Sequence, residues 1–201
     1  MKYVLTGIAV LALAMFFVVS CSDSGDDDGG DNTPTFSYPH NNGSEWIYNY
    51  EGVATIKYAL SGTFNHPAAG ETQQLFSYEP DGSGGWTQNG LGYLKVSETE
   101  VRVYTSAETS DYITYLKFPL SVGKQWDAGI GYSANVTAQE HITVPAGAFT
   151  TYKIDYSSPN WSFTIWWPSA VGGYGCKNFG VWTIEGQPMT LELASKNLPT
   201  G

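Results

Sequence analysis

Apolar and polar residues alternate with a period of two along most of the chain after position 34. Trp46, Tyr48 and Tyr50 fall on one side of such a segment, with Ile47 and Asn49 on the other. This period is typical of β-strands, and segments with a helical period are hard to find. The pattern predicts about eleven short strands, at residues 46–50, 54–60, 75–79, 91–96, 100–105, 112–118, 132–144, 148–156, 161–167, 181–185 and 189–195.

Turn residues separate these segments at short intervals, which favours an antiparallel meander over βαβ units. One hairpin is predicted in detail. Pro145 fixes the first central dihedral angle of a turn, and Gly147 can adopt a left-handed conformation that closes it. The strands at 132–144 and 148–156 should therefore pair antiparallel. We expect residues 34–201 to form a single all-β domain with very little helix.

Residues 1–20 differ from the rest of the chain, because Lys2 precedes an almost unbroken apolar run from Val4 to Val19. The run is shorter than the roughly 20 residues that span a bilayer, and it is typical of a secretory signal peptide. It ends in Val-Val-Ser-Cys at 18–21, which resembles the bacterial lipobox. That resemblance implies cleavage before Cys21 and acylation of this cysteine with diacylglycerol and palmitate-like chains. A simple secretory leader is the alternative.

The segment at 21–33 follows as an acidic linker. Residues 22–33 contain five aspartates and no apolar side chain. Such a segment cannot bury enough surface to offset its ordering entropy, so we expect a disordered tether between the lipidated Cys21 and the β domain. Acidic residues at this place also resemble an export signal of Bacteroidota-type lipoproteins. The expected location is thus the outer membrane, on either the periplasmic face or the cell surface.

Charge and cysteine content exclude several classes of protein. The chain has 9 Lys+Arg against 19 Asp+Glu, for a net charge of −10, which makes nucleic acid a poor partner. Two cysteines are too few for a disulfide scaffold. If lipid occupies Cys21, only Cys176 remains as a free thiol. It is either a small buried hydrophobic residue or a reactive group.

Motifs that carry chemistry are scarce. His40, His66 and His141 are the only histidines, and none has metal-ligand spacing. No G-x-S-x-G nucleophile elbow occurs. Cys176 and His141 could form a nucleophile–base pair, but nothing in the sequence favours that over coincidence. We expect no metal, no cofactor and no catalytic residues.

Four segments resemble phrases shared by a group of bacterial envelope lipoproteins. They are GSEWIY at 43–48, FPLSVGKQW at 118–126, ITVPAGAF at 142–149 and WWPSAVG at 166–172. In order and spacing they are similar to uncharacterised proteins of DUF3108-like and TapB-like type. The resemblance implies a single antiparallel curled sheet or incomplete barrel of about 10–12 strands, similar to the half-barrel of LolA/LolB carriers. The last phrase departs from the pattern, because Ser169-Ala170 stands where Pro-Gly is usual.

The aromatic content is unusually high, with 7 Trp and 14 Tyr. Most of these residues should fill the interior of the sheet. The strand at 161–167 is nevertheless aromatic on both sides, so either both faces are covered or the concave face is an open ligand groove. The candidate ligand-facing aromatics are Trp46, Tyr48, Trp161, Phe163, Trp166 and Trp167.

These features lead to two functional hypotheses of different classes. The first is a membrane-anchored, non-enzymatic binding or scaffold module that holds a hydrophobic ligand, an acyl chain or a hydrophobic peptide, in its curled sheet. The alternative is a surface-exposed glycan-binding module that uses aromatic platforms, with polar contacts from Asn41, Asn42 and Asn89. An enzyme and a purely structural partner in an envelope assembly are further alternatives.

Overall fold

The computed structural model describes residues 41–50, 53–168, 177–182 and 188–197. All regular structure in these ranges is β, which confirms the predicted fold class. The twelve strands are β1 (Glu45–Tyr50), β2 (Val53–His66), β3 (Gly70–Pro80), β4 (Trp86–Val96), β5 (Glu100–Tyr104), β6 (Tyr112–Lys117), β7 (Gln125–Gly129), β8 (Tyr132–Val144), β9 (Gly147–Ser157), β10 (Trp161–Pro168), β11 (Lys177–Trp182) and β12 (Pro188–Asn197).

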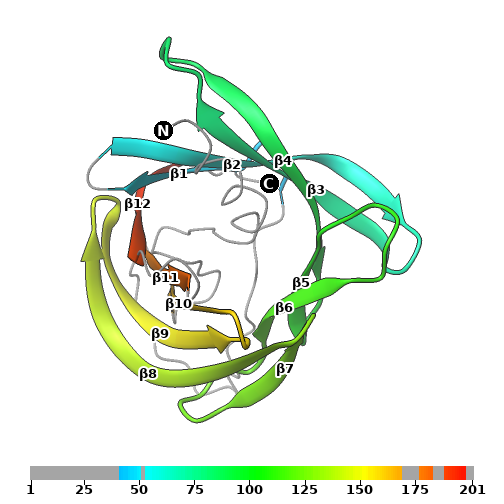
Figure 1. Ribbon diagram of the computed structural model, residues 1–201, viewed down its shortest axis with the longest axis vertical. Coiled ribbons are helices and arrows are strands. Elements are labelled where there is room, and N and C mark those ends of the chain that lie inside the picture. Colours follow the sequence, from blue (N-terminus) through cyan, green and yellow to red (C-terminus); the bar gives the residue numbers. More distant parts are fainter. Residues whose placement is uncertain (1–40, 51–52, 169–176, 183–187, 198–201) are drawn as a thin grey trace, which may run out of the picture.

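The strands form one antiparallel sheet in the order β6-β5-β4-β3-β2-β1-β12-β11-β10-β9-β8-β7. Each strand pairs with its neighbours in the sequence except at β6 and β7, which do not pair with each other, and β12 also pairs with β1. The sheet curls until its two ends, β6 and β7, lie against each other, so the molecule looks like a ring in Figure 1. This arrangement is the predicted curled sheet, an incomplete barrel whose backbone ladder stays open between β6 and β7 within the described strands.

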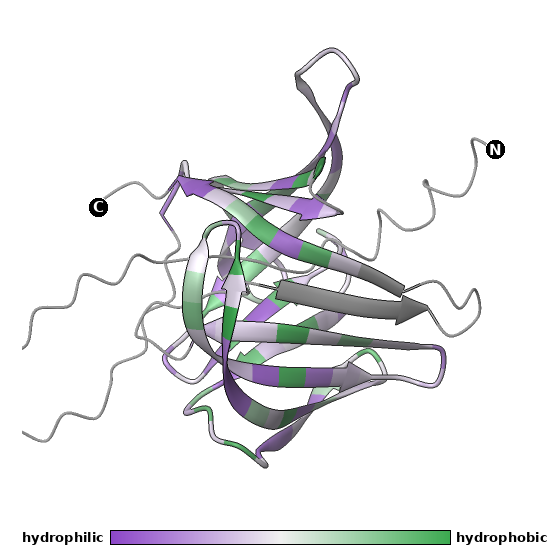
Figure 2. Ribbon diagram, turned by 90° about the vertical axis from the view of Figure 1, so that its left-hand side faces the viewer, coloured by the Kyte–Doolittle hydropathy of each residue, from purple (hydrophilic) through white to green (hydrophobic). Residues whose placement is uncertain are grey.

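The predicted alternation of residues builds the barrel interior. Hydrophobic and hydrophilic residues alternate along the strands in Figure 2. In β1, Trp46 and Tyr48 are fully buried while Ile47 is only partly so. Eighteen side chains of this core cluster are at most 2% exposed: Trp46, Tyr48, Tyr58, Leu60, Leu75, Leu94, Val101, Tyr115, Leu116, Ala128, Ala134, Val136, Ile154, Tyr156, Ile165, Trp167, Leu191 and Leu193.

Side chains close the seam between β6 and β7. The indole nitrogen of Trp126 in β7 donates to the Thr114 carbonyl of β6 at 2.9 Å. The Tyr156 hydroxyl, from β9, donates to the Tyr115 carbonyl of β6. Two carbonyl groups of an edge strand, which would be costly to bury unpaired, thus gain donors from across the seam.

The hairpin of β8 and β9 confirms the predicted turn. Val144 pairs with Gly147, and Gly147 has a positive φ of 135°. The backbone N–H of Ala146 donates to the Leu193 carbonyl of β12 at 3.0 Å. The tip of the hairpin therefore contacts another strand of the barrel. A register shift between Val136 and Ala138, which the alternation did not predict, separates the two halves of β8.

Strands β2, β3 and β4 extend well beyond the predicted segments. Their hairpins project from the ring in Figure 1. The tip of the β2–β3 hairpin is held on the outer face by His66, whose ring lies 4.5 Å from that of Tyr104. The ring is 1% exposed; its Nε2 bonds the Ser106 carbonyl at 2.8 Å, and its Nδ1 accepts from the N–H of Ala68 at 3.2 Å. His66 is therefore a structural residue of this hairpin.

Two strand predictions were wrong in detail. Strand β7 was not predicted, because it has only five residues and its two apolar residues, Trp126 and Ala128, alternate with Asp127 and a terminal glycine. The strand predicted at 181–185 lies earlier, at Lys177–Trp182. Within the described ranges we find no helical segment of the length and hydrophobicity that crossing a membrane requires. The predicted leader at 1–20, the linker at 21–33, His40 and Cys176 lie outside the described residues.

Candidate functional site

A polar groove lies on the outer face of the sheet, over β7, β8 and β9. Outward-facing side chains alternate there with the buried Trp126, Ala134 and Tyr156. Residues directly opposite each other on neighbouring strands therefore form a small grid of polar groups. The pairs are Gln125 with Asn135, Asp127 with Ser133, Asn135 with Asp155, and Ser133 with Ser157.

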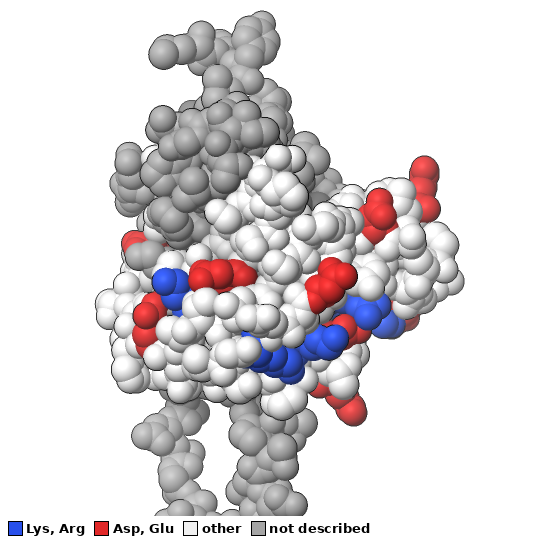
Figure 3. All heavy atoms as spheres, turned by 60° about the horizontal axis from the view of Figure 1, so that its bottom comes forward, with Lys and Arg blue, Asp and Glu red and all other residues white. Residues whose placement is uncertain are grey.

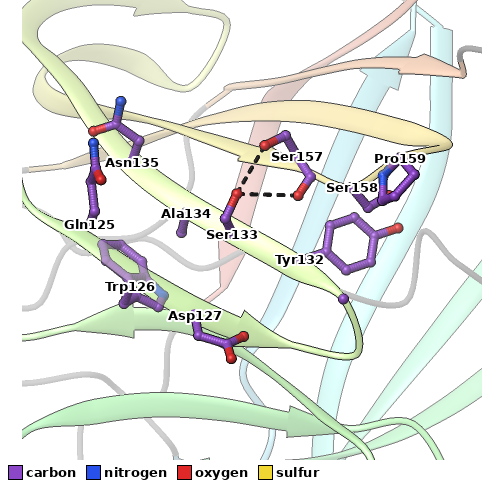
Figure 4. Close-up of a pocket in the computed structure, with 11 residues that line it drawn as sticks. Gln125, Trp126, Asp127, Tyr132, Ser133, Ala134, Asn135, Ser157, Ser158 and Pro159 are labelled. Carbon is purple, nitrogen blue, oxygen red and sulfur yellow. Dashed lines mark hydrogen bonds between the residues drawn. The ribbon is translucent and has the colours of Figure 1, made fainter.

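The groove has a volume of about 960 Å³, which is within the usual range for small-ligand sites. Ser133 lies at its centre in Figure 4, and its hydroxyl is 3.0 Å from that of Ser157. The ring of Tyr132 extends towards the β9–β10 turn, but it is only 7% exposed and packs in the core against Phe163, at 5.7 Å between ring centres, so it lies beneath the groove. The lining residues are Gln125, Trp126, Asp127, Gly131, Tyr132, Ser133, Ala134, Asn135, Ser157, Ser158 and Pro159.

Two rigid turns border the groove. In the β9–β10 turn, Ser158 and Trp161 are joined three times, by their backbones at 2.8 Å and twice through the Ser158 hydroxyl at 3.2 Å. In the β7–β8 turn, Asp127 accepts the N–H of Gly129 at 2.9 Å. Both turns are thus held by hydrogen bonds of their own, so the groove is largely pre-formed.

The β7–β8 turn has an uncommon backbone. Gly129, Ile130 and Gly131 have successive φ angles of 84°, 43° and 81°. A β-carbon at Gly129 would lie 2.3 Å from the Tyr112 carbonyl oxygen of β6, so only glycine fits there. Ile130 is the one non-glycine residue with positive φ among the described residues, and its side chain is 47% exposed.

Asp127 is the only charged residue among those lining the groove. One of its carboxylate oxygens bonds the turn, and the other points away from it in Figure 4. Elsewhere the two signs of charge are interspersed, as Figure 3 shows for one face. On the outer face of β4–β6, for example, Lys95 lies opposite Arg102, and Arg102 is 2.5 Å from Glu100. The lining is therefore a mainly neutral, hydrogen-bonding surface with one negative charge. A second carboxylate, Asp155, adjoins it opposite Asn135 and accepts the Thr164 hydroxyl at 2.6 Å.

The predicted ligand-facing aromatics do not converge on this groove. Trp46, Tyr48, Phe163 and Trp167 belong to the buried core, at 0%, 0%, 7% and 1% exposure. Trp161 and Trp166 are partly exposed. Trp166 lies on the opposite face to its neighbours, as expected, and its indole N–H donates to Glu140.

Two aromatic clusters on the outer face have lysines over their rings. Lys153 lies over Trp166, with its ammonium 5.5 Å from the ring centre. Lys57 lies 4.6 Å from the centre of Tyr78 and 5.7 Å from that of Trp86, and it also contacts Glu45 at 3.4 Å. A ring face covered by a lysine is not free to stack on a sugar, so these clusters are weaker candidates than the groove.

The histidines of the described chain lie apart from one another and from the groove, each in a local hydrogen bond. His66 is buried in the hairpin described above, and His141 bonds the Thr150 hydroxyl at 2.9 Å near the far end of β8. Among these residues, no three His, Cys, Asp or Glu side chains gather closely enough to hold a metal ion. The alternative in which His141 pairs with Cys176 is not tested, since Cys176 is outside the described ranges.

The sequence analysis missed the groove residues. Asn135, Ser133 and Ser157 are common surface residues, and only the strand register brings them together. A signal did exist in part: Ser133, Asn135 and Ser157 each alternate with buried residues along their strands, which places them on the outer face. That signal has meaning only once the pairing is known.

Two solved structures resemble this chain. One is a protein from Bacteroides fragilis, provisionally described as exported and of YmcC-like fold, with a TM-score of 0.50 at 14% identity. The alignment covers 81% of this chain and 99% of that one. The likeness shows the fold. The other, from Parabacteroides distasonis and provisionally described as a lipoprotein, has a TM-score of 0.46 at 14% identity, with the same coverage. No protein-family model and no curated protein matches the chain.

Proposed function

We propose that this chain is a lipid-anchored, non-enzymatic binding protein of the bacterial envelope. The lipobox-like Val-Val-Ser-Cys at 18–21 supports an anchor on Cys21, and the acidic segment at 22–33 supports a tether to the domain. The four motifs similar to DUF3108-like and TapB-like lipoproteins support the same placement, in the outer membrane on its periplasmic or external face.

The ligand that the geometry supports best is a glycan bound in the polar groove. The observation that carries this proposal is the lining itself, where Ser, Asn and Gln side chains on adjacent strands face one surface. Sugars offer many hydroxyl groups, which neutral donors and acceptors of this kind can bond without burying a charge. Asp127 adds a negative charge, so neutral or amino sugars should bind better than acidic ones.

The hydrophobic-ligand hypothesis has less support. It needs room inside the barrel, where the side chains of Tyr58, Tyr115, Tyr156 and Trp167 pack in one buried cluster. An acyl chain would have to displace such side chains from a close-packed interior, and that is costly. The glycan hypothesis requires no such rearrangement, because the groove is already open on the surface.

The lining of the groove also supports a binding rather than an enzymatic role. Hydrolysis of a glycoside normally requires two carboxyl groups facing each other across the bond. Asp127 is the single carboxylate among the lining residues, and one of its oxygens already accepts the N–H of Gly129. The neighbouring carboxylate, Asp155, lies outside the lining and accepts the Thr164 hydroxyl at 2.6 Å. We therefore propose recognition without chemistry.

Calorimetry with defined sugars tests this function. The probes are neutral hexasaccharides of glucose, xylose, mannose and N-acetylglucosamine, with hexagalacturonate as the acidic comparator. We expect at least one neutral sugar to bind more tightly than hexagalacturonate. Asn135→Ala should weaken that binding about fivefold or more, because a bonded amide is lost. Asn65→Ala, which changes an exposed asparagine on the distant β2–β3 hairpin, is the matched control.

Two results would contradict the proposal. One is a protein that binds none of the hexasaccharides but takes up a fluorescent fatty acid, which would restore the hydrophobic-ligand hypothesis. The other is equal weakening by Asn135→Ala and Asn65→Ala, which would move the glycan site away from the groove. Release of shorter sugars from a bound hexasaccharide would show that the protein is an enzyme.

A further inference from the structure

The turn between β7 and β8 holds a residue in a conformation that its type disfavours. Ile130 has a φ of 43°, in the left-handed region where β-branched residues are rare. Its side chain is also one of the few large aliphatic groups exposed in the described chain, at 47%. Glycine or asparagine would fit this backbone with less strain, so neither stability nor solubility explains an isoleucine here.

The surroundings keep the turn in this shape. Asp127 fixes the backbone N–H of Gly129 at 2.9 Å, and Gly129 itself packs against the Tyr112 carbonyl of β6. On the other side, Gly131 lines the groove next to Tyr132. Strain persists where the structure around it leaves no alternative, and it is concentrated at binding sites. Here the strained residue lies between two groove residues, Asp127 and Gly131.

We propose that Ile130 is a ligand-contacting residue that gives the groove an apolar edge. The inference rests on the glycan-binding function proposed above and names a further determinant of that site. A pyranose ring has polar hydroxyl groups around its rim and an apolar C–H face. The grid of Ser133, Asn135 and Gln125 would bond the hydroxyl groups. Ile130 is not itself among the residues that line the groove, but it lies between two that do, so its exposed aliphatic side chain would cover C–H groups of a sugar that extends past the end of the groove.

Paired measurements of stability and affinity test this role. The protein is the mature lipidated chain in detergent, and the probe is the neutral hexasaccharide that binds most tightly in the panel above. Ile130→Asn should raise the folded-to-unfolded ratio about threefold to tenfold in urea, because strain is relieved. The same change should weaken hexasaccharide binding at least threefold, because an apolar contact is lost. Ile130→Gly should weaken binding similarly, and it serves as a second variant.

Val122→Asn is the matched control. Val122 is likewise exposed, at 57%, but it lies in the loop before β7, at the other end of that strand, and has no positive φ. It should leave hexasaccharide affinity unchanged and should not raise stability.

The outcomes separate the two proposals. If the unaltered protein binds a hexasaccharide and Ile130→Asn binds it equally well, the role of Ile130 is overturned while the glycan function stands. If Ile130→Asn and Ile130→Gly both lower stability, Ile130 is a packing residue and the inference is again wrong. If the unaltered protein binds no hexasaccharide, both proposals fall.

Discussion

The hydroxyl groups of two buried tyrosines, Tyr156 and Tyr115, differ in their hydrogen bonding. The Tyr156 hydroxyl donates to the Tyr115 carbonyl across the seam, whereas the Tyr115 hydroxyl has no hydrogen-bond partner among the described residues. Tyr156→Phe should therefore lower the free energy of unfolding by about 1–2 kcal/mol, because it leaves a buried carbonyl unpaired. Tyr115→Phe should change it little or raise it slightly. Urea unfolding followed by tryptophan fluorescence measures both.

Tyr50→Phe is the control for this pair, since Tyr50 is 36% exposed and its hydroxyl can bond water. Equal losses of stability in Tyr156→Phe and Tyr115→Phe would mean that the Tyr115 hydroxyl has a partner in solution, such as a buried water molecule.

The buried tyrosines also predict an alkaline limit of stability. Burial raises the pKa of Tyr58, Tyr115 and Tyr156 well above the ordinary value of 10.0. Below pH 10 the three phenols are neutral in both folded and unfolded chains, so their contribution to stability is complete. Above pH 10 the unfolded chain loses protons that the folded chain keeps, and stability falls by about 1 kcal/mol per pH unit for each phenol.

Phenolate absorbance during an alkaline titration checks this prediction. Tyr58, Tyr115 and Tyr156 should ionise only together with unfolding. Smooth ionisation of all tyrosines near pH 10 with the fold retained would contradict the burial of these three.

The sequence predicted the burial of individual residues best where alternation is strict. Trp46 and Tyr48 lie two apart in β1, and both are fully buried. Their role was harder to predict, because a period of two says which residues share a face but not whether that face is packed or open. The groove residues Asn135 and Ser157 were out of reach for another reason: 22 positions separate them in the sequence, and only the register of β8 and β9 makes them neighbours.

At the scale of elements, β7 is the strand on which the seam and the groove both depend. Its last residue, Gly129, is the closest backbone approach to β6, with room for no β-carbon beside the Tyr112 carbonyl. Gly129→Ala should therefore lower the free energy of unfolding by at least about 2 kcal/mol, from steric contact added to the strain of a positive φ. Thermal or urea unfolding measures the loss.

Gly131→Ala is a matched control two residues away. Its φ of 81° is similar to that of Gly129, but a β-carbon there would meet nothing within 4 Å. It should lose only about 1 kcal/mol, the cost of the backbone strain alone. Equal losses for the two substitutions would show that the contact across the seam contributes nothing to stability.

The sequence predicted that most strands exist, but it predicted their lengths less well. Hairpins with a clear turn, such as the one at Pro145, were predicted with the correct pairing because turn geometry sets the register. The short β7 was missed because it has only five residues, among them an aspartate and a terminal glycine, although Trp126 marks it. The long β2, with Gly62 at a φ of 79°, continues past an irregular register that breaks the period of two, so alternation underestimates its length.

At the scale of the whole molecule, the proposed anchor is the feature that determines location. Cys21→Ser should abolish incorporation of labelled palmitate in cells and move the protein from the membrane fraction to the soluble fraction. Its circular dichroism should be unchanged, because the strands begin at Glu45. Ser20→Thr, a mild change beside the cleavage position, should retain labelling. Continued palmitate incorporation by Cys21→Ser would exclude this cysteine as the lipid site.

The all-β meander was predictable from turn spacing, but the position of its gap was not. In a simple up-and-down barrel, the first and last strands would be expected at the open ends of the sheet. Here β1 and β12 pair with each other, and the open ends are β6 and β7 in the middle of the chain. Local sequence patterns do not show which two neighbouring strands lack backbone hydrogen bonds to each other, because that depends on how the whole barrel closes.

The position of that gap has a mechanical consequence. Tension transmitted from a membrane through an amino-terminal tether would reach the domain at β1. This strand is hydrogen-bonded to β2 on one side and to β12 on the other. A force applied to β1 must shear the backbone hydrogen bonds to both neighbouring strands at once. The gap between β6 and β7, where the barrel has no backbone hydrogen bonds, lies away from this point of attachment. The same molecule tethered through a residue of β6 or β7 would peel open far more readily.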